Sequence, residues 1–316
     1  MPPPLWLTSA ALWGLESSET SLDSECVCLM RMARRLFPLF CLSCLLLLIV
    51  SSCGESGGRG PVKPSLCVSV APQKYLLDAI VGDLYDVHVL IPENADPESY
   101  DPSMRAMKDL YDSSIFFSLG NEGFEKALIA KIKANFPELR IVSATAGLPL
   151  ITDTHGEEST DPHVWGSVKT VAGIARNMTE ALCLADPGHA ETFRRNNMKL
   201  QASLDSLDRE VRAKLSHADG AFAIWHPSLS YFARDYSLRQ LPLEVEGKEA
   251  APGQFSRRLD DIRASGAKVM FIEPLHGAER AEAMAEELNL KCVKINLGAL
   301  DWPAQIRLIA SSLQND

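Results

Sequence analysis

The sequence lacks the marks of several common classes of protein. No basic stripe offsets its formal net charge of −10, which argues against nucleic acid as a partner. It contains no His-Glu-x-x-His motif and no P-loop, because Gly247-Lys248 is followed by glutamate. No apolar run reaches the roughly 20 residues that a membrane-spanning helix needs. These absences exclude a nucleic-acid-binding protein, the commonest type of zinc protease and a transporter ATPase.

Cysteine is scarce beyond the N-terminal region. Of the 8 cysteines in the chain, only Cys67, Cys183 and Cys292 follow residue 53. Their apolar surroundings predict buried thiols that pack as small hydrophobic side chains. In an oxidising compartment a disulfide between two of them stays open as an alternative. A framework of several disulfides is not expected to hold this fold together.

The N-terminal region carries the features of an export signal. Arg31, Arg34 and Arg35 precede an apolar run over residues 36–50, and small residues follow it. The segment Val50-Ser51-Ser52-Cys53 resembles a bacterial lipobox, which predicts that Cys53 is acylated and becomes the first residue of the mature protein. An uncleaved anchor or a buried helix is the alternative interpretation.

Short apolar strands alternate with helices along the rest of the chain. We predict strands at 66–70, 86–91, 114–119, 140–143, 221–225, 241–245, 269–272 and 292–295. We predict helices at 73–81, 104–111, 123–135, 168–184, 254–264, 278–288 and 302–313. This alternation predicts βαβ units on parallel sheets.

A long stretch without proline or a further glycine separates the two halves of this pattern, from Gly188 to about His217. Asp186-Pro187 fits an N-cap followed by proline at the first helical position. A helix of roughly 30 residues would be about 45 Å long. We interpret it as a spine between two lobes, with an ordinary long helix on a single core as the alternative. The expected fold class is therefore α/β, with two mainly parallel sheets flanked by helices and joined by one long helix.

These features predict the domain organisation. We expect translation to begin at Met30 or Met32, so that residues before it are an upstream extension. The expected segments are an upstream extension at 1–29, a lipoprotein signal peptide at 30–53, a flexible tether at 54–64, an N-terminal lobe at 65–184, a linking helix at 185–219 and a C-terminal lobe at 220–316.

Three turns that lie far apart in the sequence each offer one side chain that can bind a metal ion. These side chains are Glu98, His163 and His226. One carboxylate and two imidazoles suit a divalent cation such as zinc, whose nitrogen and oxygen ligands lie at about 2.0–2.2 Å. Taken singly, a solvated acid and two hydrogen-bonded histidines are the simpler interpretations.

Three polar residues follow predicted strands of the second half. They are His226, Glu273 and Asn296. In open α/β sheets, ligands bind beyond the carboxyl ends of the strands. We therefore expect these three side chains to converge at one edge of the second sheet.

The segments Asp161-Pro162-His163-Val164-Trp165 and His226–Ala233 resemble motifs of the substrate-binding lipoproteins of bacterial zinc and manganese ABC importers. The resemblance runs from about Cys67 to the C-terminus. It implies two α/β lobes with a metal ion between them. It also implies an exported, lipid-anchored receptor facing the periplasm or the cell exterior. Such a receptor is not an enzyme. It captures zinc, or in second place manganese, and delivers the ion to a membrane permease that works with an ATPase.

Two positions depart from the pattern of that family. Glu98 stands where the family usually has histidine, and Asn296 stands where it usually has aspartate. An amide oxygen is a poorer zinc ligand than a carboxylate, so Glu273 is the alternative fourth ligand. Asp301 is also near, but its position before Trp302-Pro303 predicts a helix cap.

Two other functions stay open on the sequence alone. The first is a zinc-dependent hydrolase, because two histidines and a glutamate also hold catalytic zinc. The second is a receptor for a siderophore or cobalamin built on the same long-helix plan, which would need a broad cleft lined by aromatic residues or arginine.

Overall fold

The computed structural model describes residues 63–97, 99–120, 123–152, 160–218, 220–245, 248–249, 252–275 and 277–314. The predicted upstream extension, the signal peptide with Cys53 and nearly all of the tether lie outside these ranges, and so does Glu98. Among the helices that are described, none combines the length and the hydropathy needed to cross a membrane.

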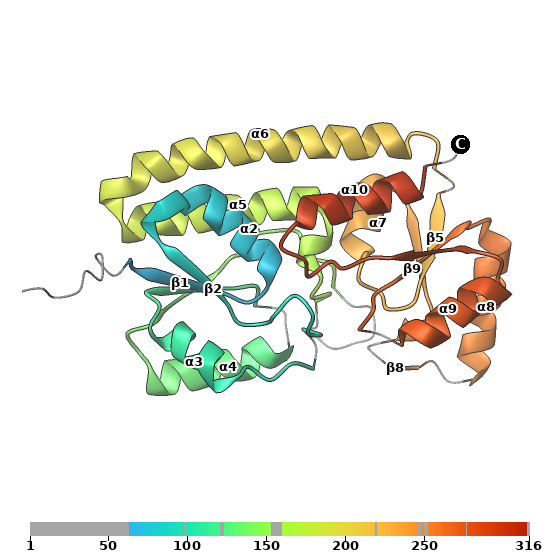
Figure 1. Ribbon diagram of the computed structural model, residues 1–316, viewed down its shortest axis with the longest axis horizontal. Helices are drawn as coiled ribbons and strands as arrows, with labels where there is room; N and C mark the ends of the chain where they lie inside the picture. The colour runs from blue at the N-terminus through green and yellow to red at the C-terminus, as the bar shows by residue number, and fades with distance from the viewer. Residues whose placement is uncertain are drawn as a thin grey trace, which may run out of the picture. The chain divides into compact units, whose positions relative to one another are not determined.

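The N-terminal lobe is built on a parallel sheet with the strand order β2-β1-β3-β4. Its strands are β1 (Ser65–Val68), β2 (Asp86–Val89), β3 (Ile115–Ser118) and β4 (Arg140–Ser143). Its helices are α2 (Ala71–Val81), α3 (Met104–Tyr111), α4 (Gly123–Asn135) and α5 (Val168–Ala185). Helices α3 and α4 cover one face of this sheet, and α2 and α5 lie on the other (Figure 1).

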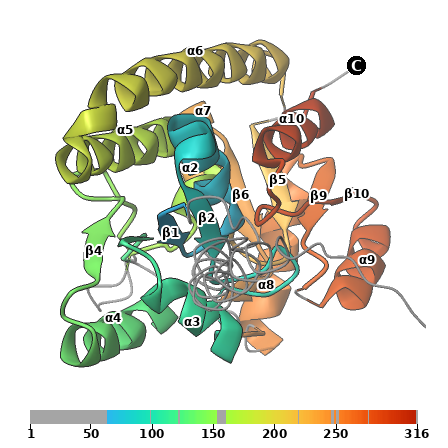
Figure 2. The same ribbon diagram turned by 60° about the vertical axis from the view of Figure 1, so that its left-hand side comes forward.

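The C-terminal lobe has a second parallel sheet, with the strand order β10-β9-β5-β6. Its strands are β5 (Ala221–Ile224), β6 (Arg239–Pro242), β9 (Val269–Ile272) and β10 (Lys291–Lys294). Its helices are α7 (Ser230–Tyr236), α8 (Pro252–Ser265), α9 (Ala278–Glu287) and α10 (Trp302–Ser312). Helices α8 and α9 pack on the face of the sheet that is turned away from α10 (Figure 2).

Both lobes have the same topology. In each, the first strand has the second strand on one side and the third and fourth strands on the other. The direction of the chain across the sheet therefore reverses between β1 and β3, and again between β5 and β9. Ligands of open α/β sheets bind in the crevice beyond the carboxyl ends of the strands at such a reversal. The two lobes thus offer two candidate positions for a site.

One long helix, α6 (Ala190–Leu215), runs between the two sets of strands. It has 26 residues, so it is about 39 Å long. It packs against α2 and α5 of the first lobe and against α10 of the second (Figure 1). The predicted fold class, with two sheets and a long helix, is confirmed.

The start of the long helix differs from the prediction. Residues Pro187–His189 form a separate 3-10 turn, and α6 begins at Ala190. The Asp186 side chain makes no cap hydrogen bond, because its carboxylate binds the His189 ring at 2.7 Å and the Tyr85 hydroxyl at 2.9 Å. Asp186 therefore ties the turn to the first lobe and does not cap the helix.

A single buried apolar cluster includes residues of both sheets. Phe116 and Phe117 of β3, Leu204 of α6 and Phe222 of β5 all belong to it. A smaller cluster lies between the opposite face of the second sheet and α8 and α9, and it includes Ala223. Alternate residues of β5 face the two clusters, as the period of two in a strand requires. Because the larger cluster is continuous, the lobes share one hydrophobic core.

The expectation of three buried cysteines is correct only for Cys67. Cys183 is half-buried and Cys292 is exposed, and all three are free thiols. Cys292 lies on β10, which is an edge strand whose residues alternate poorly between buried and exposed positions. Cys183 lies in the last turn of α5. Apolar neighbours in the sequence did not reveal that these two positions are at the margins of the lobes.

A buried carboxylate fills the crevice of the N-terminal lobe. Glu125, at the start of α4, is fully buried and accepts hydrogen bonds from the Ser69 hydroxyl, from the Leu119 N–H at 3.0 Å and from the Gly120 N–H. Gln73 binds the same strand ends, since its side chain contacts the backbone of Ser69 and Val70. This crevice is occupied by the protein's own side chains, which leaves the crevice of the second lobe for a ligand.

Candidate metal site

The two predicted histidines meet in the structure. His226 follows β5 at its carboxyl end, and His163 precedes a 3-10 turn, η2 (Val164–Gly166), which leads into α5. The Nε2 atoms of the two rings lie 3.2 Å apart. His226 is 1% exposed and His163 is 7% exposed. The fold therefore brings together two imidazoles that are 63 residues apart in the sequence.

A carboxylate lies behind each ring. The Nδ1 atom of His163 is 3.0 Å from Asp161 Oδ1, and the Nδ1 atom of His226 is 3.3 Å from Glu244 Oε2. Carboxylates accept hydrogen bonds, so each Nδ1 carries the proton and each Nε2 is left with a lone pair. A carboxylate behind a histidine in this way is the usual support of a metal-binding imidazole, because it orients the ring and raises its basicity.

The distance between the two Nε2 atoms fits a shared metal ion. Two lone pairs that face each other at 3.2 Å repel unless a proton or a cation lies between them. Zinc binds histidine nitrogen at about 2.0–2.1 Å with tetrahedral angles, which places two such nitrogens about 3.3–3.4 Å apart. The observed spacing is close to that value. The pair of histidines is thus arranged as half of a tetrahedral site.

Asp161 is held in its charged form behind His163. Burial by itself raises the pKa of this carboxyl group, but hydrogen bonds from His163 and Ser230, together with the charge of the imidazole, bring the pKa below its ordinary value. The backbone N–H of His163 also donates to Asp161 Oδ1 at 2.9 Å. A charged group next to the ring strengthens its attraction for a cation.

Glu244 was not among the predicted site residues. We predicted one strand at 241–245, but β6 ends at Pro242, and Glu244 begins a short strand, β7 (Glu244–Val245), paired with β8 (Lys248–Glu249). The Glu244 N–H still bonds to the Trp225 carbonyl at 2.9 Å, which carries the side chain past the end of β5 to His226. Its other oxygen accepts from Trp225 Nε1 at 2.7 Å. An acid at the carboxyl end of a strand next to β5 was the available signal.

Replacing Glu244 with glutamine should weaken zinc binding about tenfold, at the lower end of the 10–100-fold cost typical of changes behind metal-binding histidines. The amide has nearly the same shape but no charge, so the His226 ring loses basicity while its packing is kept. Zinc titration of the variant against a chromophoric chelator measures this. An unchanged affinity would mean that Glu244 supports only the Trp225 side chain.

Glu273 and Asn296 lie on the wall of a cavity of about 70 Å³ that His163 and Trp165 also line. Glu273 follows β9 directly, and β9 pairs with β5 so that Ile224 lies opposite Phe271. Two residues further along each strand, His226 and Glu273 are side by side at the point where the chain reverses direction across the sheet. The predicted convergence at this edge is observed, and it falls in the crevice of the second lobe.

The Asn296 side chain is already engaged by the protein. Its oxygen accepts from the Gly298 N–H at 3.0 Å, and its amide donates to the Glu93 carbonyl at 3.3 Å. Glu93 also accepts from the Leu300 N–H at 2.9 Å, so this contact joins a loop of the first lobe to a loop of the second. Asp301 caps α10 through the Ala304 N–H at 3.2 Å, as its sequence position predicted.

The third predicted ligand, Glu98, lies outside the described residues. Among the residues that are described, no three histidine, cysteine, aspartate or glutamate side chains are arranged to hold a metal ion together. In the same ranges, two buried polar side-chain atoms have no hydrogen-bond partner, and these are Trp165 Nε1 and Ser228 Oγ. Each is two residues from one of the histidines. Unsatisfied buried groups of this kind are rare and often mark a functional site.

Two α/β lobes on one long helix, with a pair of oriented histidines at the edge of the second sheet, define a metal-binding receptor and not a local metal-binding finger. The chain matches the model of the family described as zinc-uptake complex component A, periplasmic (ZnuA), over residues 67–304. That match covers more than half of the chain, so the protein belongs to this family. The predicted family resemblance is confirmed.

Individual relatives agree with this assignment. The high-affinity zinc uptake system protein ZnuA of Bacillus subtilis (strain 168) is 23% identical over 271 residues, which cover 79% of this chain and 84% of that protein. A crystal structure of ZnuA matches with a TM-score of 0.75 at 29% identity and covers 80% of this chain and 100% of that one. A ZnuA deletion mutant with zinc bound matches with a TM-score of 0.75 at 28% identity, over 80% and 99% of the two chains. The protein is a metal-binding receptor of an importer of this class.

Proposed function

We propose that this protein is an exported, lipid-anchored receptor that captures zinc between its lobes and passes it to the permease of an ABC importer. The contact between His163 and His226 at 3.2 Å carries this proposal, because it is spaced for one tetrahedral ion. The ion is cargo, bound and released unchanged. The ATPase that drives transport is a separate protein, since this chain has no P-loop.

The proposed ligands are Glu98, His163 and His226. For the fourth position we favour Glu273 over Asn296. The hydrogen bonds of the Asn296 side chain join loops of the two lobes, whereas the Glu273 carboxylate lines the cavity beside His226. Two carboxylates and two neutral imidazoles neutralise the charge of a divalent ion. This balance also suits the burial of both histidines, because a buried charge needs a compensating partner.

The size of the cavity supports a bare ion as cargo. A volume of about 70 Å³ holds an ion with a few waters. Pockets for organic ligands are about 300–1,000 Å³, so a siderophore, cobalamin or the substrate of a hydrolase would need far more room. We therefore infer that the protein has no enzymatic activity and that it binds the free ion. A hydrolytic activity that disappears in a Glu98→Ala variant would contradict this.

The shared core supports a small movement on release. The larger apolar cluster continues from one sheet to the other, and α6 packs on both lobes. Interfaces packed in this way slide or tilt slightly, and they do not open like a hinge. The contact of Glu93 with Asn296 and Leu300 is a polar closure between loops that such a tilt can break.

The proposed location follows from the predicted signal peptide. Cleavage before Cys53 and acylation of its thiol would anchor the mature protein to a membrane, facing the periplasm or the cell exterior. The tether predicted at 54–64 would then let the receptor reach the permease. Mass spectrometry of the mature N-terminus tests both the cleavage and the lipid.

Competition between metals tests the function. Zinc should displace manganese when both are present at the same concentration, because nitrogen and oxygen sites bind zinc more tightly in the order of intrinsic affinities. The measurement is titration of the metal-free protein with each ion and then with both, read by calorimetry. A protein that binds neither ion, or that binds a metal chelate but not the free ion, would refute the proposal.

A further inference from the structure

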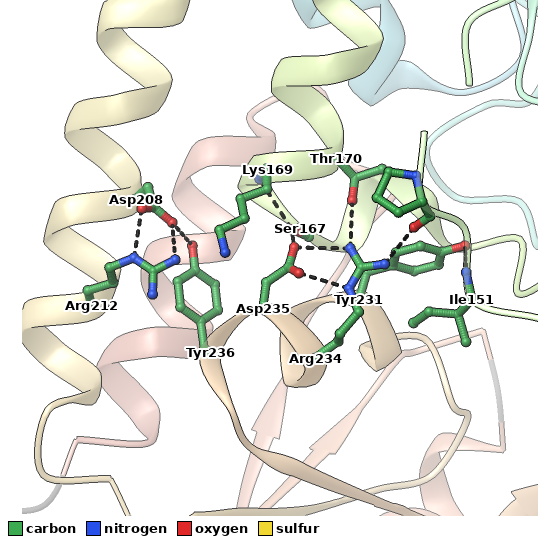
Figure 3. A network of polar contacts seen from close by, with 11 residues as sticks. Ile151, Ser167, Lys169, Thr170, Asp208, Arg212, Tyr231, Arg234, Asp235 and Tyr236 are labelled. Carbon is green, nitrogen blue, oxygen red and sulfur yellow. Dashed lines mark hydrogen bonds and ion pairs between the residues drawn. The ribbon is translucent and has the colours of Figure 1, made fainter. Parts of the chain in front are cut away.

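Tyr231 connects the segments that carry the two histidines. It lies on α7, five residues after His226, but its hydroxyl group bonds to the segment of the other histidine. The hydroxyl donates to the Asp161 carbonyl at 2.9 Å and accepts from the Ile151 N–H at 3.1 Å (Figure 3). Both hydrogen-bonding roles of a tyrosine hydroxyl are thereby used, and the side chain is fully buried.

The residue that Tyr231 binds is the one that orients His163. Asp161 accepts from both the ring and the backbone N–H of His163. A continuous chain of contacts therefore leads from one imidazole through Asp161 to the Tyr231 hydroxyl. From there the backbone of α7 leads back to His226. A change in the position of the hydroxyl would change the distance between the two rings.

Neighbouring polar groups hold Tyr231 in place. The Arg234 guanidinium lies over its ring, 4.9 Å from the ring centre, and donates to the Pro149 carbonyl at 2.7 Å. Asp235 pairs with Arg234 at 2.8 Å and accepts from the Ser167 hydroxyl, which caps the start of α5 (Figure 3). Helix α7 is thus fastened to the chain before and after His163. Such a network is far more rigid than any one of its bonds.

We propose that Tyr231 is a positioning residue that sets the spacing of His163 and His226, and with it the affinity and coordination geometry of the metal site. This inference rests on the proposed function, because it assumes that the two rings share an ion. It assigns the fixed half of the site to the histidines, which α7 locks together. The half that moves on release then consists of the loops that carry Glu98 and Glu273.

The test is a Tyr231→Phe variant compared with Tyr236→Phe. Tyr236 is the matched control, since it lies on the same helix, is buried and donates one hydrogen bond, to Asp208 at 2.9 Å on α6 and not toward the histidines (Figure 3). Tyr231→Phe should weaken zinc binding about tenfold, within the 10–100-fold cost typical of groups that support metal ligands. Tyr236→Phe should leave the zinc affinity unchanged.

The absorption spectrum of bound Co²⁺ provides a readout that a loss of stability would not move. Its visible bands should shift or lose intensity in Tyr231→Phe, because the two nitrogens move relative to the metal, and should stay as in the parent in Tyr236→Phe. Equal zinc affinities and identical Co²⁺ spectra in both variants would overturn the inference. If Tyr231→Phe does not fold, Asp235→Asn tests the same point, since it loosens α7 and leaves the hydroxyl intact. It should change the spectrum in the same direction, and an unchanged spectrum would overturn the inference.

A His163→Ala variant in the same titration separates the two levels of the argument. If His163→Ala loses zinc while Tyr231→Phe binds like the parent, the positioning role fails and the receptor function stands. If His163→Ala also binds zinc like the parent, the proposed site itself is wrong.

Discussion

Alanine in place of His163 or His226 should weaken zinc binding by about 100-fold or more. Each substitution removes a direct nitrogen ligand, so its effect should exceed the 10–100-fold loss typical of changes to the groups behind such ligands. The neighbouring carboxylate, Asp161 or Glu244, would then lose the ring that it orients. Calorimetric titration with zinc, with competition by a chelator of known affinity, measures the change.

His189→Ala is the matched control for these variants. The His189 ring also contacts a carboxylate through Nδ1, at 2.7 Å from Asp186, but it lies at the start of α6 and is half exposed. Its removal should leave zinc binding unchanged. Because His226 is buried, its variant must also be shown to fold, by circular dichroism and thermal unfolding. Zinc binding equal to that of the parent in folded variants of both His163 and His226 would remove the basis of the proposed site.

Alanine in place of Glu125 should cause the largest loss of stability. The substitution leaves three donors without an acceptor, the Ser69 hydroxyl and the N–H groups of Leu119 and Gly120. A buried unsatisfied polar group costs about 1–3 kcal/mol, so the free energy of unfolding should fall by about 2–4 kcal/mol once part of the cost is relieved by water. Urea denaturation of the metal-free protein measures it. A loss below about 1 kcal/mol would show that the crevice of the first lobe does not depend on this carboxylate.

The same residue predicts a dependence of stability on pH. Burial raises the pKa of Glu125 above its ordinary value of 4.5, although its three hydrogen bonds act in the opposite direction. The folded protein therefore holds this proton to a higher pH than the unfolded chain does. The contribution of Glu125 to stability is complete below about pH 4.5 and declines as pH rises through the folded pKa. Glu125→Gln should remove this decline, which denaturation of both proteins across pH 4–8 can check.

Much of the architecture could be predicted because it depends on local patterns. Continuous apolar runs of four or five residues identify the central strands, and the stretch from Gly188 to about His217 identifies the long helix. The position of His226 at a strand end followed from the same pattern. The rule that ligands bind at carboxyl ends then placed His226 and Glu273 at one edge, where the structure has them.

Other features depend on contacts that no local pattern records. Glu244 reaches His226 only because the chain continues along β5 after Pro242 and then turns into a short hairpin. The hydroxyl of Tyr231 was visible only as part of a motif, and its partners, Ile151 and Asp161, lie about 70 to 80 residues earlier in the chain. Asn296 resembled a weak metal ligand in the sequence. Its hydrogen bonds to Glu93 and Gly298 give it a structural task that the sequence does not express.

Diffraction from zinc-loaded crystals at the zinc absorption edge tests the central claim most directly. We expect one anomalous peak about 2.0–2.1 Å from the Nε2 atoms of both His163 and His226, with a Glu98 oxygen at about 2.0–2.2 Å. A peak bound to only one of the two rings, or located elsewhere on the protein, would contradict the account.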